Sequence, residues 1–221
     1  MNAGRLSPHI GPAAPLALEY RGRQLVQAMQ LRRIADAEGV WLDAEPHIYS
    51  RGGVELLGVT EILKNVGLID ERWWAEDHAV RGRLVHTIAA RVVNDEPAAD
   101  GYAGYEQSLR IWQGGEAPIT LATELLVSHD QSGYAGTLDW LMVWREAIWV
   151  IDFKTGAEAK WQRLQTAGYA EALRSLPDCP PLRRAALYLH EDGTPATVRV
   201  HYDPADHAYF KAALAVETFK R

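Results

Sequence analysis

Two carboxylates and one lysine occur at the ends of apolar stretches in the middle of the chain. Asp139 ends the segment GTLD, and Asp152 and Lys154 end the apolar run IWVIDFK. Because side chains alternate between the two faces of a strand, Asp152 and Lys154 point the same way and Phe153 points to the opposite face. A lone carboxylate in an apolar strand is costly unless a cation or hydrogen bonds offset its charge. We therefore expect Asp139 to have a partner.

A tight turn at Arg145-Glu146-Ala147 would fold these two stretches into a hairpin that sets Asp139 opposite Asp152. Two neighbouring carboxylates repel each other, so one takes up a proton or a divalent cation lies between them. Glu124 is a third acid in an apolar strand, expected alongside. Three carboxylates and a lysine at one end of a sheet form a hard, oxygen-rich site that suits magnesium or manganese. An ordinary exposed ion pair and an exposed edge glutamate are the alternatives.

Two helical segments carry further polar residues. Gly82 and His86 are one turn apart on the helix expected before these strands, and the small neighbours would let His86 approach the sheet. A half-buried histidine without a ligand is the alternative. Gln165 and Tyr169 are four residues apart and share one face of the helix after Lys154; a polar helix rim is the alternative reading there.

The pattern of apolar residues predicts an α/β (α+β) protein in which helices flank a mixed central sheet. Residues 1–18 are expected to form a flexible arm and residues 19–221 a single domain. Two hairpins are expected, over 47–57 and 183–202, together with three strands at 121–128, 136–144 and 147–153. Helices are expected at 70–93, at 105–112 before Gly114-Gly115 stops the helix, at 158–176, and from Asp203 as N-cap and Pro204 as first helical residue to the C-terminus; Thr60 is expected to cap a short turn.

Composition excludes several classes of protein. The 221 residues are 48% hydrophobic and 24% charged with a formal net charge of -6, which is typical of a globular domain. The single cysteine, Cys179, cannot form an internal disulfide, a thiolate zinc site or an iron–sulfur cluster. Prolines interrupt the N-terminal apolar residues and no run reaches membrane-spanning length, so we expect a cytoplasmic protein with no membrane partner.

The order of these elements resembles the PD-(D/E)xK nuclease superfamily, and in particular its RecB-like, phage-type exonuclease branch. The matching segments are GTLD, IDFKTG, Gln165 with Tyr169 as Q-x-x-x-Y, and RGRLVH, which is similar to the Gly-x-x-x-His element of the branch. The resemblance implies a restriction-endonuclease-like core that binds one or two Mg²⁺ or Mn²⁺ ions. It implies catalytic roles for Glu124, Asp139, Asp152 and Lys154, and metal binding by His86, Glu124, Asp139, Asp152 and Phe153. Lys154 would deprotonate the attacking water or stabilise charge, and the residues alone do not choose between these roles.

The resemblance implies a metal-dependent deoxyribonuclease, an exonuclease in phage-type recombination, repair or DNA processing. Its partners would be single- or double-stranded DNA and a recombination protein. Gln165, Tyr169, Arg81 and Arg83 would contact the substrate, although a solvated charged face also explains the two arginines. The chain has no phosphate-binding loop of an ATP-driven motor. A catalytically silent nuclease fold that binds DNA or protein, a structure-specific endonuclease and an RNA nuclease are the alternatives.

Overall fold

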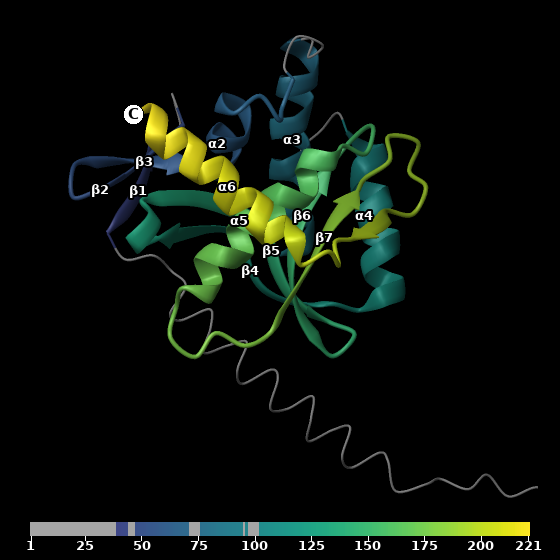
Figure 1. The fold of residues 1–221 in the computed structure, drawn as a ribbon. Coiled ribbons are helices and arrows are strands. Elements are labelled where there is room, and N and C mark those ends of the chain that lie inside the picture. Colours follow the sequence, from purple (N-terminus) through teal and green to yellow (C-terminus); the bar gives the residue numbers. More distant parts are fainter. Residues whose placement is uncertain (1–38, 44–46, 71–75, 95, 97–101) are drawn as a thin grey trace, which may run out of the picture.

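The computed structural model describes residues 39–43, 47–70, 76–94, 96 and 102–221. The arm expected at residues 1–18 lies outside these residues. The described part forms one eight-stranded mixed sheet with helices on both faces (Figure 1), as the sequence predicts at this level. None of the described helices combines the length and the apolar character that crossing a bilayer requires.

The sheet has the strand order β1-β2-β3-β5-β6-β7-β8, and β4 pairs with β5 beside this path. The pairs β3–β5 and β6–β7 are parallel, and the others are antiparallel. Both predicted hairpins are confirmed, as β2–β3 and β7–β8. The strands are β1 (Val40–Asp43), β2 (Ile48–Arg51), β3 (Val54–Gly58), β4 (Ile119–His129), β5 (Tyr134–Trp144), β6 (Ala147–Lys154), β7 (Leu182–Tyr188) and β8 (Thr197–Val200).

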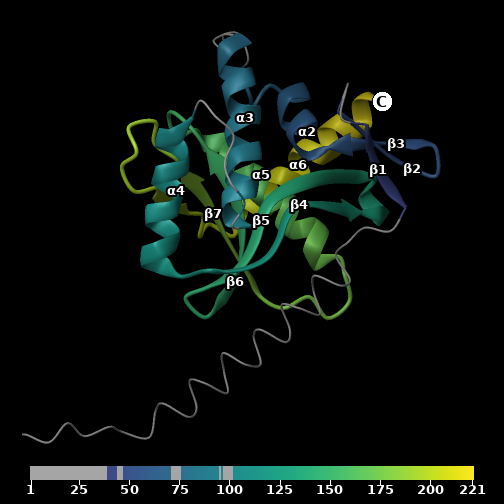
Figure 2. The same cartoon turned by 180° about the vertical axis from the view of Figure 1, so that it is seen from behind.

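Two apolar layers sandwich the sheet. Helices α2 (Val59–Asn65), α5 (Lys160–Arg174) and α6 (Ala205–Lys220) pack with one layer, which includes Leu138, Val150 and Phe210. Helices α3 (Glu76–Val93) and α4 (Ala103–Glu116) pack with the other layer, seen from behind in Figure 2, against Trp140 and Phe153. The sheet is therefore buried on both faces in its centre, where β5 and β6 run.

Several predicted boundaries are wrong for physical reasons. Thr60 does not cap α2, because the helix starts at Val59 with Gly58 as its N-cap, whose N–H donates to Glu61 Oε2 at 2.9 Å. Gly114-Gly115 does not stop α4, which continues to Glu116. There Glu116 accepts hydrogen bonds from Trp144 Nε1 and Arg145, and this tertiary anchoring outweighs the low helix propensity of two glycines.

Two helix starts also differ from the prediction. Asp70 lies outside any helix, and the described part of α3 begins at Glu76; residues 71–75 lie outside the description. Helix α6 begins at Ala205 with Pro204 as N-cap, whereas the sequence predicted Asp203 as N-cap. Asp203 still contributes, since its Oδ1 accepts from the Ala205 N–H at 2.9 Å.

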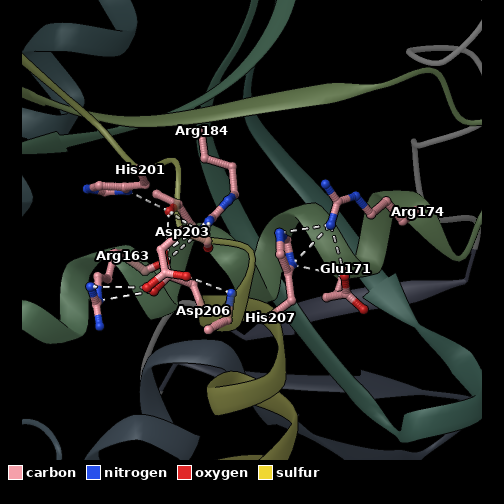
Figure 3. A network of polar contacts seen from close by, with 10 residues as sticks. Arg163, Glu171, Arg174, Arg184, His201, Asp203, Asp206 and His207 are labelled. Carbon is pink, nitrogen blue, oxygen red and sulfur yellow. Dashed lines mark hydrogen bonds and ion pairs between the residues drawn. The ribbon is translucent and has the colours of Figure 1, made fainter.

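A buried ion pair fastens α5 and α6 to β7 (Figure 3). The Arg184 guanidinium lies 3.0 Å from Asp206 Oδ2, and both side chains are buried. Arg184 also donates to the carbonyl oxygens of Arg163 and Asp203. Arg163 Nε approaches the second Asp206 oxygen to 3.0 Å. Three elements thus share one carboxylate, and α5 is held at a fixed height over the sheet.

Removing the charge of Asp206 should destabilise the protein strongly. Asp206→Asn leaves Arg184 buried without its counter-ion, which is expected to lower the free energy of unfolding by about 3 kcal/mol in urea titrations. The matched control is Asp203→Asn, because Asp203 is half exposed and 3.9 Å from Arg163; it should change stability by less than about 0.5 kcal/mol. Equal effects of the two variants would contradict the role of the buried pair.

His201 should make the stability depend on pH. Burial and the positive charges of Arg184 and Arg163 lower the pKa of His201 to about 4, below the unfolded value of 6.5. As the pH falls, the unfolded chain therefore takes up a proton on His201 before the folded protein does. The contribution of His201 to the free energy of unfolding is fully present above pH 6.5 and is lost as the pH drops toward 4. We expect a loss of about 1–2 kcal/mol attributable to His201 between pH 7.5 and pH 5. His201→Asn, which keeps a donor for Thr166, should flatten this part of the urea profile, and an unchanged profile would contradict the assignment.

Candidate metal centre

Strand β5 changes its neighbour at the centre of the sheet. Its first residues, Tyr134 and Ala135, pair with β3, and residues from Trp140 onward pair with β6. Residues 136–139 of β5 pair with neither β3 nor β6, so the sheet forks where Asp139 lies. The predicted β5–β6 register is confirmed, because Trp140 pairs with Ile151. Past this pair, the Asp139 side chain accepts the Phe153 N–H through Oδ2 at 2.6 Å.

His86 approaches the same carboxylate from α3. Its Nδ1 lies 3.2 Å from Asp139 Oδ1, and its ring packs edge-on against Phe153 with the centroids 6.3 Å apart. The next turn of α3 carries Ala89 and Ala90, of which Ala89 is fully buried, and these small side chains are consistent with the close approach predicted from the sequence. Asp139 is thus held by a side chain from α3 and a backbone group from β6.

Glu124 completes a group of three residues that could hold a metal ion. Thr123 pairs with Trp140 and Leu125 with Leu138, so Glu124 falls at the level of Asp139 on the adjoining strand. Its φ of 49° is in the left-handed region and interrupts the ladder there. Ligand atoms of His86, Glu124 and Asp139 lie within 4.8 Å of one another. A non-glycine residue with a left-handed backbone costs about 1 kcal/mol or more. The surroundings of Glu124 therefore have to offset this strain to hold its side chain in this orientation.

Asp152 and Lys154 form the second half of the site. Asp152 is fully buried, and its Oδ2 forms an ion pair with the Lys154 ammonium. Its Oδ1 has no hydrogen-bond partner among the described residues. Lys154 is mostly buried and lies 5.2 Å from the centre of the Trp161 ring, a cation–π contact.

The charges of the site are strongly coupled. Burial would lower the pKa of His86, but the charge and hydrogen bond of Asp139 raise it to about 8. In turn His86 and Lys154 overcome burial and keep the pKa of Asp139 low. Burial, only partly offset by Lys154, raises the pKa of Asp152 to about 6. Loss of solvation in the crowded site, followed by the charge of Asp139, raises the pKa of Glu124 to about 7.

Gln165 and Tyr169 lie on the face of α5 that covers the acids. Gln165 Nε2 donates to Tyr169 Oη at 3.0 Å and to Thr60 Oγ1 at 3.3 Å, and both side chains are buried. A Cβ on Gly136 would come within 2.7 Å of the Tyr169 ring, so this glycine makes room for the tyrosine in β5. Burial and the charges of Asp152 and Asp139 raise the pKa of Tyr169. The two residues are placed to support the acidic site from α5.

The structure gives the remaining predicted residues different places. The Phe153 backbone N–H orients Asp139, and its ring lies in the layer of α3 and α4, as strand alternation predicts. Arg81 lies near Tyr105 of α4. Burial raises the pKa of Tyr105, and the positive charge of Arg81 only partly offsets this rise. Among the described residues, no hydrogen bond or ion pair joins Arg81 to the acids. The side chain of Arg83 lies outside the described part of the chain.

Trp161 is the residue of the site that the sequence reasoning did not assign. Its spacing was a usable signal, because Trp161, Gln165 and Tyr169 recur every four residues and share one face of α5. The structure places that face over the acids, with Trp161 at Lys154. The contact of an aromatic ring with the lysine depends on how α5 returns over β6, which no local pattern shows.

The donor set fits a divalent cation. A fully buried carboxylate oxygen without a partner, Asp152 Oδ1, is costly unless a charged ligand satisfies it. A histidine and two carboxylates, with atoms within 4.8 Å, offer the nitrogen and oxygen ligands of such an ion. Asp152 is outside that group of three but interacts electrostatically with both His86 and Asp139. No protein-family model and no curated protein matches this sequence.

Replacing Glu124 should separate stability from metal binding. Asn tolerates positive φ and removes the repulsion with Asp139, so Glu124→Asn should raise the melting temperature by about 2–4 °C in EDTA. Added Mn²⁺ should stabilise the wild type and stabilise the variant less. Differential scanning calorimetry measures both effects. A variant that is no more stable in EDTA, or that responds to Mn²⁺ like the wild type, would contradict this account of Glu124.

Proposed function

We propose that this protein is a metal-dependent nuclease that hydrolyses phosphodiester bonds in DNA. The observation that carries the proposal is the meeting of Asp139, Asp152 and Lys154 at the sheet fork, with His86 and Glu124 on the other side of Asp139. The sequence resemblance to the RecB-like branch of PD-(D/E)xK nucleases supports it, and so does the central mixed sheet with helices on both faces. The core is accordingly proposed to be restriction-endonuclease-like.

His86, Glu124, Asp139 and Asp152 would hold the cation, proposed to be Mg²⁺ or Mn²⁺, as one or two ions. When bound, such an ion supplies a water molecule of lowered pKa and neutralises charge on the phosphate. The carboxylates contribute negative charge at fixed positions. His86 contributes a nitrogen ligand, whose other neighbour is the ring of Phe153.

Lys154 is assigned to stabilise charge rather than to act as a base. Its ammonium is paired with Asp152 and lies over the Trp161 ring, so both neighbours hold it in place beside the acids. A charged ammonium can hold the attacking water or the developing negative charge on the phosphate oxygens. Gln165 and Tyr169 would hold the α5 side of the site in place through their mutual hydrogen bond.

The substrate proposed is linear DNA, which an exonuclease in recombination, repair or DNA processing would degrade from an end. Metal chemistry at the acids does not set polarity or strand preference, because these depend on the surfaces around the site. An exonuclease needs a free end and an endonuclease does not. The experiment is therefore built around the ends of the substrate.

End-labelled single- and double-stranded DNA, end-labelled RNA and closed circular DNA are incubated with Mg²⁺, Mn²⁺ or EDTA. We expect metal-dependent degradation of the linear substrates by the wild type and a loss of at least about 100-fold in rate with Lys154→Ala. The variant should still bind DNA in the presence of metal, whereas Asp139→Asn should weaken metal binding as well as cleavage. The matched control is Lys211→Ala, which removes a lysine that pairs with Glu171 on α5.

The outcomes separate the alternatives. Cutting of closed circles by the wild type, lost in Lys154→Ala, would identify an endonuclease that uses the same site. Cleavage of RNA alone would replace DNA as the substrate. Undiminished activity of Lys154→Ala, or no cleavage of any nucleic acid by the wild type with either metal, would contradict the proposed function.

A further inference from the structure

Helix α6 is apolar on two opposite faces. One face packs on α2 and α5 through residues that include Phe210 and Leu214. A surface helix normally carries polar residues on its other face. On the outer face of α6, however, Phe219 is 91% exposed, Tyr209 54% and Val216 50%. Figure 1 shows α6 running across the front of the molecule, outside α5. A contiguous set of exposed apolar side chains marks a site of interaction with another protein surface.

The exposed residues have the spacing of a coiled-coil seam. They follow one another at intervals of three, four and three positions and so form one stripe along α6, which consists of Tyr209, Ala212, Val216 and Phe219. Ala208 and Ala215 lie along one side of this stripe and are also exposed. Because the distance between packed helices depends on the side chains at the contact, these small residues let a second helix come close.

The stripe is complementary to itself when two copies of α6 run antiparallel. A two-fold axis midway between Ala212 and Val216 sets Tyr209 opposite Phe219 of the second copy. The same axis sets Ala212 opposite Val216 of the second copy. A two-fold interface consists of such reciprocal pairs. The pairing joins two aromatic rings at each end and places a small residue against a β-branched one in the middle, so the side chains interdigitate.

The charges on α6 are compatible with this pairing. The stripe itself is uncharged, and the two lysines of the helix are already paired within the chain, Lys211 with Glu171 and Lys220 with Glu217. A charge buried at an interface without a counter-ion would oppose association. Covering the stripe with a second copy therefore buries no unpaired charge.

A cavity beside the stripe can take an aromatic side chain. It has a volume of about 550 Å³, lies between α6 and the turn from β4 to β5, and is lined by residues that include Tyr134, Phe210 and Phe219. Ala215, at the edge of the stripe, also lines it. Because Tyr209 of the second copy lies opposite Phe219, its ring is placed at the mouth of this cavity. Aromatic residues that fill a pocket of the partner supply much of the binding energy of an interface.

We propose that the protein forms a two-fold symmetric dimer in which α6 packs antiparallel against α6 of a second copy. This inference does not depend on the proposed nuclease function. One helix face about 24 Å long is smaller than a standard protein interface, so the dimer is concentration-dependent, with Kd on the order of 10 µM. His86 reaches the acids from α3, on the other face of the sheet (Figure 2), so the dimer leaves that side of the site uncovered.

The test is sedimentation velocity of the whole chain at protein concentrations from about 1 to 200 µM. We expect monomers at the low end of this range and dimers at the high end. Val216→Glu puts a charge into the stripe and should raise Kd at least about tenfold. Ile111→Glu is the matched control, because Ile111 is also β-branched, lies on a helix and is 44% exposed. This control should leave Kd unchanged.

A charge swap tests the antiparallel pairing. Tyr209→Glu and Phe219→Lys should each weaken association when studied alone. An equimolar mixture of the two variants should associate more tightly than either, since one carboxylate then faces one ammonium and one aromatic pair remains. A mixture no tighter than its components would show that the two positions do not meet, and the proposed pairing would be wrong.

Melting temperatures separate a dimer from a contact within one chain. Val216 is half exposed, so Val216→Glu should keep the melting temperature of the dilute wild type. A large drop would mean that a segment of the same chain, outside the described residues, covers α6, and the inference would be wrong. A wild type that stays monomeric at about 200 µM, or a Val216→Glu variant that dimerises like the wild type, would also overturn it.

Discussion

Crowding of negative charge at the fork of the sheet is the constraint around which the rest of the structure is arranged. Strand β5 leaves β3 before it joins β6, and Asp139 lies in the gap. The carboxylate replaces a missing ladder partner by accepting the Phe153 N–H. Asp139 lies close enough to both Glu124 and Asp152 to raise the cost of ionising each of them. The surrounding layers hold these groups together against their repulsion.

Each layer supplies one source of positive charge or rigidity. Helix α3 supplies His86, which pairs with Asp139, and β6 supplies Lys154, which pairs with Asp152. Helix α5 covers the site with Trp161, Gln165 and Tyr169, and the buried Arg184–Asp206 pair fixes α5 and α6 to the sheet (Figure 3). The fold is less stable than it could be because it holds the site in one arrangement, as the left-handed backbone of Glu124 shows.

The sequence predicts the mixed sheet and the convergence of Asp139 with Asp152 because both depend on local patterns. Strand alternation and a two-residue turn at Arg145-Glu146 set the β5–β6 register without reference to the rest of the chain. Helix ends were less predictable, since Glu116 carries α4 past two glycines only through contacts with Trp144 and Arg145. The spacing of Trp161 with Gln165 and Tyr169 marks one helix face, but its contact with Lys154 depends on how α5 returns over β6, which no local pattern shows.

We propose that the acids at the fork bind a divalent cation, and titration with Mn²⁺ measures such binding directly. Electron paramagnetic resonance counts the free ion as protein is added, for the wild type and for Asp152→Asn. The account predicts one or two Mn²⁺ ions bound per chain by the wild type, with affinity reduced at least about tenfold in the variant. Absence of bound Mn²⁺ in the wild type, or equal binding by Asp152→Asn, would contradict it.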